Sequence, residues 1–308
     1  MLAVFLQVLP FFAIIGLGWG AGRLGYFPDV ATAWLTRFVF FFALSAMLFR
    51  FTAKLPLGDV IDLRVMGAYI LASGAVYALA FWGAKRRGEP LAVRAFEAHS
   101  AIHGNIGFLG LPMLAQVMGD HALRVILQLL AIDLLVFTTL LVALVSASLG
   151  GKIGLAALRP VLIGIGKNPM MLAISLGFLW SGFGVPVPKP MDDFLLLLGA
   201  AATPGALFAI GASLASKRLA RPAIAGWISF LKLIVHPAAM ALAAYIIGVE
   251  PKLAAVMAAS AALPVAGNVF MQALHYGVAP QRVSAAILVS TAVSALTVSL
   301  ILTKVLTW

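Results

Sequence analysis

The sequence has few charged residues and no cysteine, and these two absences narrow the class of protein. Charged side chains make up 10% of the 308 residues, against about 25% in soluble domains. So few charges cannot cover the surface of a water-soluble protein. This excludes a soluble enzyme, a nucleic-acid-binding protein and a disordered chain. Without cysteine, the chain has neither disulfides nor thiol chemistry.

Apolar runs, in contrast, are long and frequent. Hydrophobic residues make up 63% of the chain, and several runs reach the roughly 20 residues that span a bilayer. The first run lacks a basic n-region and a small-residue cleavage site, so we interpret it as a membrane span and not as a signal peptide. The pattern predicts an all-α polytopic membrane protein with ten transmembrane helices. These cover residues 2–22, 31–51, 64–84, 95–118, 122–148, 168–185, 190–215, 222–248, 252–276 and 282–306.

The basic residues predict how the chain is oriented. The net charge of +11 is spread over the loops between spans, which argues against a nucleic-acid partner. Cytoplasmic loops collect Lys and Arg. Alternate loops carry thirteen and seven basic residues, and Lys232 falls within a span. We therefore expect both termini on the non-cytoplasmic side of a plasma membrane, the inner membrane of a bacterium. The richer side holds Arg23, Arg37, Lys85, Arg86, Arg87, Arg94, Lys152, Arg159, Lys167, Lys217, Arg218, Arg221 and Arg282.

The two halves of the chain resemble each other. A shift of 159 residues aligns LPFFAIIGLG with NPMMLAISLG, and ALSAMLF with ATPGALF. The predicted division is a five-helix repeat over residues 1–148, a cytoplasmic connector over 149–167 and a second repeat over 168–308. The connector is either a short amphipathic segment or an ordinary basic loop. Because five spans is an odd number, the second repeat is inverted, which favours a transporter.

Helices four and nine carry helix-breaking residues inside their spans. Helix four contains His103-Gly104-Asn105-Ile106-Gly107-Phe108-Leu109-Gly110-Leu111-Pro112, and helix nine contains Ala261-Ala262-Leu263-Pro264-Val265-Ala266-Gly267-Asn268. Glycine and proline weaken a helix and free backbone polar groups, which are costly in hydrocarbon unless protein, water or substrate satisfies them. We interpret Pro112 and Pro264 as corresponding breaks. Such a pair indicates a binding site near the middle of the membrane.

These motifs resemble the auxin efflux carrier family. The resemblance rests on HGNIGFLGLPM, KLIVHP, ALPVAGNVFMQALHYGVAP, the span with Ser290-Thr291, the KNP at 167–169 and TPGALFAIGASL at 203–214, and it covers nearly the whole chain. It implies two inverted five-helix repeats, as in bile-acid/sodium symporters. Helices 1, 2, 6 and 7 would form a scaffold, and helices 3–5 with 8–10 a transport domain. The unwound segments would cross at Pro112 and Pro264.

The resemblance also implies a function. The chain would move small organic anions, such as malate, malonate or auxin-like acids, by alternating access with an elevator-like or rocking motion. Asn105 and the groups around Pro264 would contact the substrate carboxylate, and position adds Asn268. The half-helix N-termini at the crossing supply partial positive charge for an anion. The predicted substrate site is Asn105, Gly107, Pro112, Pro264 and Asn268.

Four ionisable residues inside the spans each have two interpretations. Lys232 attracts an anionic substrate or changes its charge when it gains or loses a proton, or else its ammonium group reaches the membrane interface while its stem stays buried. Asp133 carries a proton or pairs with Lys232, or else it is a structural charge. His236 and His103 titrate, or else they are structural histidines. The spacing of Glu97, His99 and His103 does not fit a metal site.

Two other functions compete with an anion carrier. One is a sodium-coupled symporter, because broken helices can supply carbonyl ligands without carboxylates; proton coupling and uniport also stay open. The other is a non-transporting membrane sensor. An enzyme is not expected, because hydrolase and nucleotide-binding motifs are missing and one deep carboxylate does not make a catalytic set. No cofactor is expected. The expected partners are the anion, protons or sodium, the bilayer, and a second copy that contacts the scaffold helices.

Overall fold

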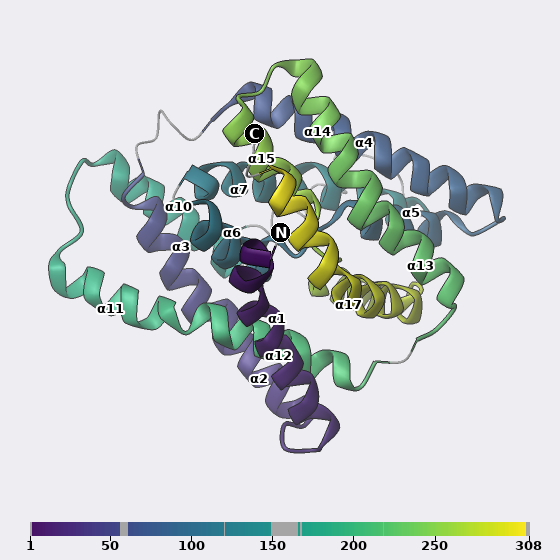
Figure 1. Cartoon of the computed structure of the whole chain (residues 1–308), viewed down its shortest axis with the longest axis horizontal. Helices are drawn as coiled ribbons and strands as arrows, with labels where there is room; N and C mark the ends of the chain where they lie inside the picture. Colours follow the sequence, from purple (N-terminus) through teal and green to yellow (C-terminus); the bar gives the residue numbers. More distant parts are fainter. Residues whose placement is uncertain are drawn as a thin grey trace. The chain divides into compact units, whose positions relative to one another are not determined.

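The computed structural model describes residues 2–55, 61–119, 121–148, 166, 168–217 and 219–305. Except for Gly166, the predicted connector 149–167 lies outside these ranges. The described chain is helical apart from its connections and one isolated β-bridge (Figure 1). In the first half the helices are α1 (Leu2–Arg23), α2 (Asp29–Phe38), η1 (Val39–Ala43), α3 (Leu44–Thr52), α4 (Leu63–Arg86), α5 (Leu91–Ile102), η3 (Ile106–Gly110), α6 (Leu111–Met118), α7 (His121–Ile132), η4 (Asp133–Thr138) and α8 (Thr139–Ser148), where η marks a π-helix.

The second half follows a similar order. Its helices are α10 (Pro169–Gly182), α11 (Lys189–Ala200), α12 (Ala202–Ala215), α13 (Pro222–Phe230), η6 (Leu231–Val235), α14 (His236–Ile247), α15 (Pro251–Ala261), α16 (Gly267–Tyr276) and α17 (Pro280–Val305).

Proline and capping residues set the helix boundaries. The Asn168 side chain accepts hydrogen bonds from the backbone N–H groups of Met170 (2.9 Å) and Met171 (3.3 Å), so it caps α10 at the KNP motif. Asp62 caps α4 in the same way. Proline follows the cap position in α13 and α15, where its missing N–H costs no hydrogen bond.

Seven helical runs within the described ranges are long and apolar enough to cross a bilayer. They are Leu6–Arg23, Asp29–Thr52, Leu63–Arg86, His121–Ser148, Lys189–Ala215, Pro222–Ile247 and Pro280–Val305. Two shorter apolar helices are Ile106–Met118 and Pro169–Gly182. The predicted all-α polytopic architecture is confirmed. The count of ten stays a prediction, because interrupted runs are too short to qualify alone.

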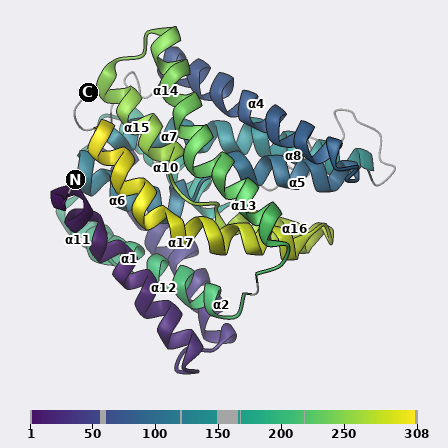
Figure 2. The ribbon, with the colours of Figure 1, turned by 45° about the vertical axis from the view of Figure 1, so that its right-hand side comes forward.

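The chain forms two compact units that combine segments from both halves. Unit 1 contains Met1–Leu9, Asp62–Val161 and Lys217–Trp308, and unit 2 contains Pro10–Ile61 and Leu162–Ser216. Within unit 1, α4 packs along α14, as both views show (Figures 1 and 2).

Unit 2 is held together by close backbone approach at glycines. A Cβ atom added to Gly211 of α12 would lie 1.9 Å from the carbonyl oxygen of Ile15 in α1. One added to Gly177 of α10 would lie 1.9 Å from Oγ1 of Thr52 in α3. Glycine at these positions lets membrane helices approach closely enough to gain dispersion energy.

Candidate functional site

Two helices of unit 1 are interrupted where the sequence predicts breaks. α5 ends at Ile102 and the helical chain resumes with η3 at Ile106. α15 ends at Ala261, and α16 begins at Gly267 after the extended residue Ala266. Each interruption exposes main-chain N–H and carbonyl groups that a continuous helix would have paired.

The two interruptions pair with each other. Gly104 and Val265 form an antiparallel β-bridge. Around it, the Asn105 N–H donates to the Pro264 carbonyl (2.8 Å), and the Ala266 N–H donates to the His103 carbonyl (3.1 Å). The Val265 N–H donates to Ser290 Oγ (3.1 Å) of α17. The broken helices thus satisfy each other's backbone, which a membrane interior requires.

The predicted crossing at Pro112 is wrong, because the break comes earlier in the chain. Pro112 is the second residue of α6, but η3 and α6 form one helical run, Ile106–Met118, so the chain stays helical at this proline. The chain leaves helical geometry at His103, and the bridge falls on Gly104. Gly110 in η3 leaves space for the unwound segment between α15 and α16, since a Cβ atom at Gly110 would lie 2.4 Å from Cδ1 of Leu263.

Lys232 lies beside the bridge and is completely buried. Its Nζ donates to the Ala261 carbonyl at the end of α15 and lies 3.3 Å from His236 Nδ1. A Cβ on Gly104 would lie 3.2 Å from this Nζ, so glycine leaves space for the ammonium group. His236 Nε2 in turn lies 3.0 Å from Ser73 Oγ of α4. The Lys232 side chain therefore stays inside unit 1 and does not extend to the membrane–water interface.

Asp133 does not form an ion pair with Lys232 in the described part of the chain. Instead its Oδ1 accepts a hydrogen bond from the Tyr69 hydroxyl (2.7 Å), and its Oδ2 lies 3.5 Å from His103 Nδ1. Asp133 and Lys232 still interact electrostatically at longer range than an ion pair, so the role of Asp133 as the partner of Lys232 stays a prediction. Asp133 is 1% exposed, and it is the first residue of η4.

The two predicted asparagines follow the two interruptions, Asn105 just before η3 and Asn268 in α16. Asn105 is buried, and its carbonyl accepts hydrogen bonds from Leu109 (3.1 Å) and Gly110 (2.9 Å). Asn268 is exposed in the first turn of α16, and its Nδ2 lies 3.1 Å from His103 Nε2. Among the residues that the structure describes, no side chain caps α16. Its first N–H groups, at Gly267 and Asn268, are therefore available to an anion.

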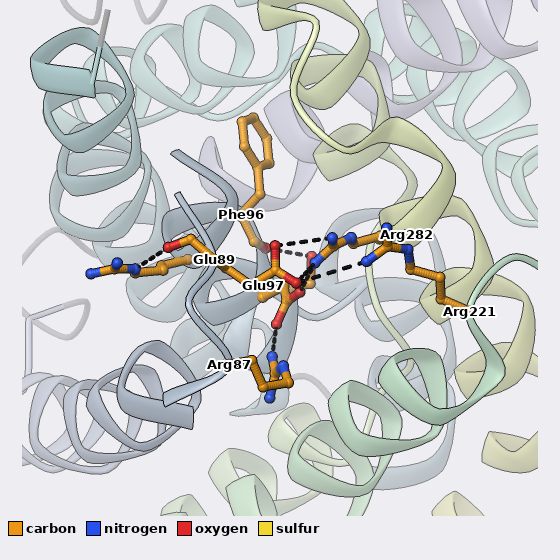
Figure 3. A network of polar contacts seen from close by, with 8 residues as sticks. Arg87, Glu89, Phe96, Glu97, Arg221 and Arg282 are labelled. Carbon is orange, nitrogen blue, oxygen red and sulfur yellow. Dashed lines mark hydrogen bonds and ion pairs between the residues drawn. The ribbon is translucent and has the colours of Figure 1, made fainter. Parts of the chain in front are cut away.

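A second polar cluster lies where α4, α5, α13 and α17 begin or end (Figure 3). Nη1 of Arg282 lies 2.7 Å from Oε1 of both Glu89 and Glu97. Arg87 also bonds Glu97, and Arg221 approaches Glu89 at 3.8 Å. The hydrogen bond from Arg282 holds the pKa of Glu89 below its ordinary value of 4.5. Glu97, which pairs with both Arg87 and Arg282, is thus a member of an ion-pair network.

Several partners in these networks were not predicted from the sequence. Tyr69, Ser73 and Ser290 look like ordinary residues of apolar spans, yet each bonds a group at the crossing. Gln128 is a further case: its Oε1 accepts a hydrogen bond from the Asp62 N–H (2.8 Å) at the start of α4. A buried polar residue on a helix face that meets another polar position would have been the usable signal.

The long apolar helices and the paired breaks define a multi-pass membrane protein. A family model described as "Membrane transport protein" matches residues 3–302. The chain belongs to this family, and the resemblance to auxin efflux carriers is confirmed.

Two relatives are similar over nearly their whole length. A Rhizobium meliloti (strain 1021) protein named "Putative malonate transporter" is 31% identical over 301 residues, which cover 95% of this chain and 92% of the relative. The Escherichia coli (strain K12) protein named "Uncharacterized transporter YfdV" is 27% identical over 312 residues, with 94% of each chain covered. The chain is therefore a membrane transporter.

Proposed function

We propose that this chain is a secondary transporter that binds small organic anions, such as malonate, malate or auxin-like acids, at the Gly104–Val265 crossing. The observation that carries the proposal is the uncapped start of α16 beside this bridge. Exposed N–H groups there add a partial positive charge. Asn268 lies in the same turn, and Asn105 lies across the bridge. The name of the Rhizobium meliloti relative supports a dicarboxylate such as malonate.

The helix boundaries support an internal duplication. α4 begins at Leu63 and α13 at Pro222, whereas α7 begins at His121 and α17 at Pro280. Both pairs differ by 159 residues, and the same offset relates Asn105 to Pro264. Pro112 then corresponds to Met271, so the two prolines are not equivalent. We propose ten spans in two inverted repeats of five, over 1–148 and 168–308.

The two units support a division of labour. We propose that unit 1 is the transport domain, because it contains both interrupted helices and the buried ionisable residues. Unit 2 would be the scaffold, and a homodimer would form through it. Transport would then proceed by alternating access with an elevator-like motion of unit 1. Gly107 and Pro112, in η3 and α6, would shape one wall of the site.

Direct binding tests the proposed site. Purified protein in detergent is titrated with malonate, malate and indole-3-acetate, with and without sodium. A buried amide hydrogen bond to a carboxylate contributes about 1.5–3 kcal/mol. Asn105→Ala and Asn268→Ala should each weaken binding about 10- to 150-fold. Gln281→Ala, outside the crossing, is the control. Wild-type affinity in both asparagine variants would place the substrate elsewhere. Binding that requires sodium would favour the symporter alternative.

Orientation is tested by cysteine labelling in intact cells. Ser148 and Ser216 are exposed and lie on the predicted cytoplasmic side. Thr307, near the C-terminus, lies outside the described residues. Cysteines at the first two positions should be shielded from an impermeant thiol reagent, and a cysteine at Thr307 should react. The reverse pattern would overturn the proposed placement of both termini outside a bacterial inner membrane.

A further inference from the structure

Two buried polar atoms beside the crossing face each other without a hydrogen bond. They are Nδ1 of His103 and Oδ2 of Asp133, 3.5 Å apart, and within the described ranges neither atom has a hydrogen-bond partner. The two side chains are 9% and 2% exposed. Unpaired buried polar atoms are costly and need an explanation. A proton on Nδ1, directed at the carboxylate, is the arrangement that suits both atoms.

The other ring nitrogen of His103 meets the predicted substrate site. Nε2 lies 3.1 Å from Nδ2 of Asn268. An amide nitrogen only donates, so Nε2 accepts in this arrangement and the ring carries its proton on Nδ1. In this state Asn268 uses one of its two amide N–H groups on His103. One N–H group then remains for a substrate carboxylate.

We propose that His103 and Asp133 form a proton-binding pair that sets the direction of the Asn268 amide, so that a proton and an anion bind together. This inference rests on the proposed function, because it assumes that Asn268 faces the anion. When His103 binds a second proton, both ring nitrogens donate. Nε2–H then needs an acceptor, and rotation of the amide supplies the Asn268 oxygen. Both amide N–H groups turn away from His103 and toward the anion.

The proton step is simple in chemical terms. Hydronium gives one proton to Nε2 of His103 and leaves as water, with no change of oxidation state. The new positive charge forms an ion pair with the Asp133 carboxylate, which the Tyr69 hydroxyl also stabilises. The proton does not alter the fold, because only the amide plane of Asn268 has to turn.

The charged and titratable groups around His103 come from α5, the helix that it ends, and from α4, η4 and η6. His99, one turn earlier in α5, stacks on its ring with centroids 4.7 Å apart. The ammonium group of Lys232 in η6 repels a positive charge on this ring, so Asp133 must offset that repulsion. Tyr69 in α4 reaches it through Asp133 in η4. Asp133 is the anion of this set, so it is the group that can compensate an imidazolium.

Linkage makes the effect reciprocal. If a proton strengthens anion binding, the anion strengthens proton binding by the same factor. Anion affinity should therefore rise as the pH falls, by up to about tenfold per pH unit, the limit for one linked proton. Each bound anion should bring up to one proton with it, and the transported species would be the pair.

Calorimetry with malonate as the probe measures this proton directly. The full chain in detergent is titrated between pH 6 and pH 8 in two buffers with different ionisation enthalpies, which reports the protons taken up per malonate. His103→Gln keeps an amide near Nε2 that can bond Asn268 but cannot titrate. We expect it to bind malonate with no proton uptake and a flat pH dependence. His275→Gln, an exposed histidine of α16, is the control and should behave as wild type.

Asp133→Asn is the second variant, in case His103→Gln does not fold. It keeps an acceptor for Tyr69 but removes the charge that compensates His103, so proton uptake at pH 7 should fall by at least half. Proton uptake equal to wild type in either folded variant would overturn the pair. If wild-type protein binds malonate without proton uptake and with pH-independent affinity, the switch fails and the anion site stands. If the wild-type protein binds none of malonate, malate and indole-3-acetate, both the proposed anion site and the proton-binding pair fail.

Discussion

The two units differ most in what they bury. Among the described residues of unit 2, the buried polar side chains are Thr32 and Thr52, and both bond carbonyls of their own helices or caps. Among the described residues of unit 1, the buried acidic, lysine and histidine side chains are Glu97, His99, His103, Asp133, Lys232 and His236. Charged groups are expensive inside a membrane protein and are retained where they act. Unit 2 is thus stabilised by close helix packing, whereas unit 1 contains buried charged groups that lower its stability.

The largest expected effect comes from breaking the packing of unit 2. Gly211→Ala places a methyl group 1.9 Å from the Ile15 carbonyl and 2.8 Å from the Trp19 nitrogen. These are backbone atoms, so the helices must separate, at a cost of about 3 kcal/mol or more. We expect a strong loss of monodisperse protein and a lower Tm. Gly20→Ala in α1 meets nothing within 4 Å and is the matched control. Equal Tm values would contradict close packing.

Lys232→Met should have the opposite profile, with lost function and preserved folding. Methionine fills a similar volume and removes the desolvation cost of a buried ammonium group, which offsets the hydrogen bond lost by the Ala261 carbonyl. Malonate transport in proteoliposomes should nevertheless fall at least about tenfold, the equivalent of 1.4 kcal/mol. Lys54→Met in unit 2, a lysine with a 47% exposed side chain, should leave transport nearly unchanged. A lower Tm with normal transport in Lys232→Met would make this lysine purely structural.

Ser290→Ala tests the support of the bridge. It leaves the buried Val265 N–H without its acceptor, which should cost about 1–3 kcal/mol. Ser294→Ala is the matched control, because the Ser294 hydroxyl bonds the Thr291 carbonyl of its own helix (2.8 Å). Thermal unfolding in detergent compares the two. The same Tm in both variants would mean that the bridge does not depend on α17.

The smallest effect is expected at the ion-pair cluster. The lowered pKa of Glu89 means that its charge stabilises the folded protein above pH 4.5, and this stabilisation is lost as the pH falls through the lowered pKa. Glu89→Gln should therefore lower the Tm by a few degrees at most at pH 7, and the difference should shrink below pH 4.5. Lys85→Gln is a charge-changing control. A difference independent of pH would assign the effect to packing.

The sequence predicts the helical runs well because apolar length and proline positions are local signals. α4 at Leu63–Arg86 and α7 through α8 at His121–Ser148 agree with their predicted ranges within a few residues. The interruption at His103 is less predictable. Proline is present in both motifs, but only Pro264 lies in an unwound segment, whereas Pro112 lies inside the helical run Ile106–Met118, directly after a π-helical turn. The effect of a proline depends on the hydrogen bonds around it.

The polar partners could not be predicted because they are distant in sequence. Tyr69 bonds Asp133 across 64 positions, and Asn268 bonds His103 across 165. A charge count also misses pairing: Arg282 counts as one of thirteen basic residues, yet two glutamates hold it. Only the fold determines which buried groups meet, since many pairings satisfy the same apolar pattern.

The π-helices have a consequence for how this chain tolerates insertions and deletions. Asp133 opens η4, and Lys232 lies in η6, so both buried charges sit on turns with one residue more than an α-helix needs. Deleting one residue there would restore α-helical winding, and because the wide turn already absorbs the extra residue, the helix beyond it would keep its orientation. α8 and α14 would then present nearly the same faces to their neighbours. A deletion of one residue elsewhere in these helices would instead rotate everything beyond it by about 100°.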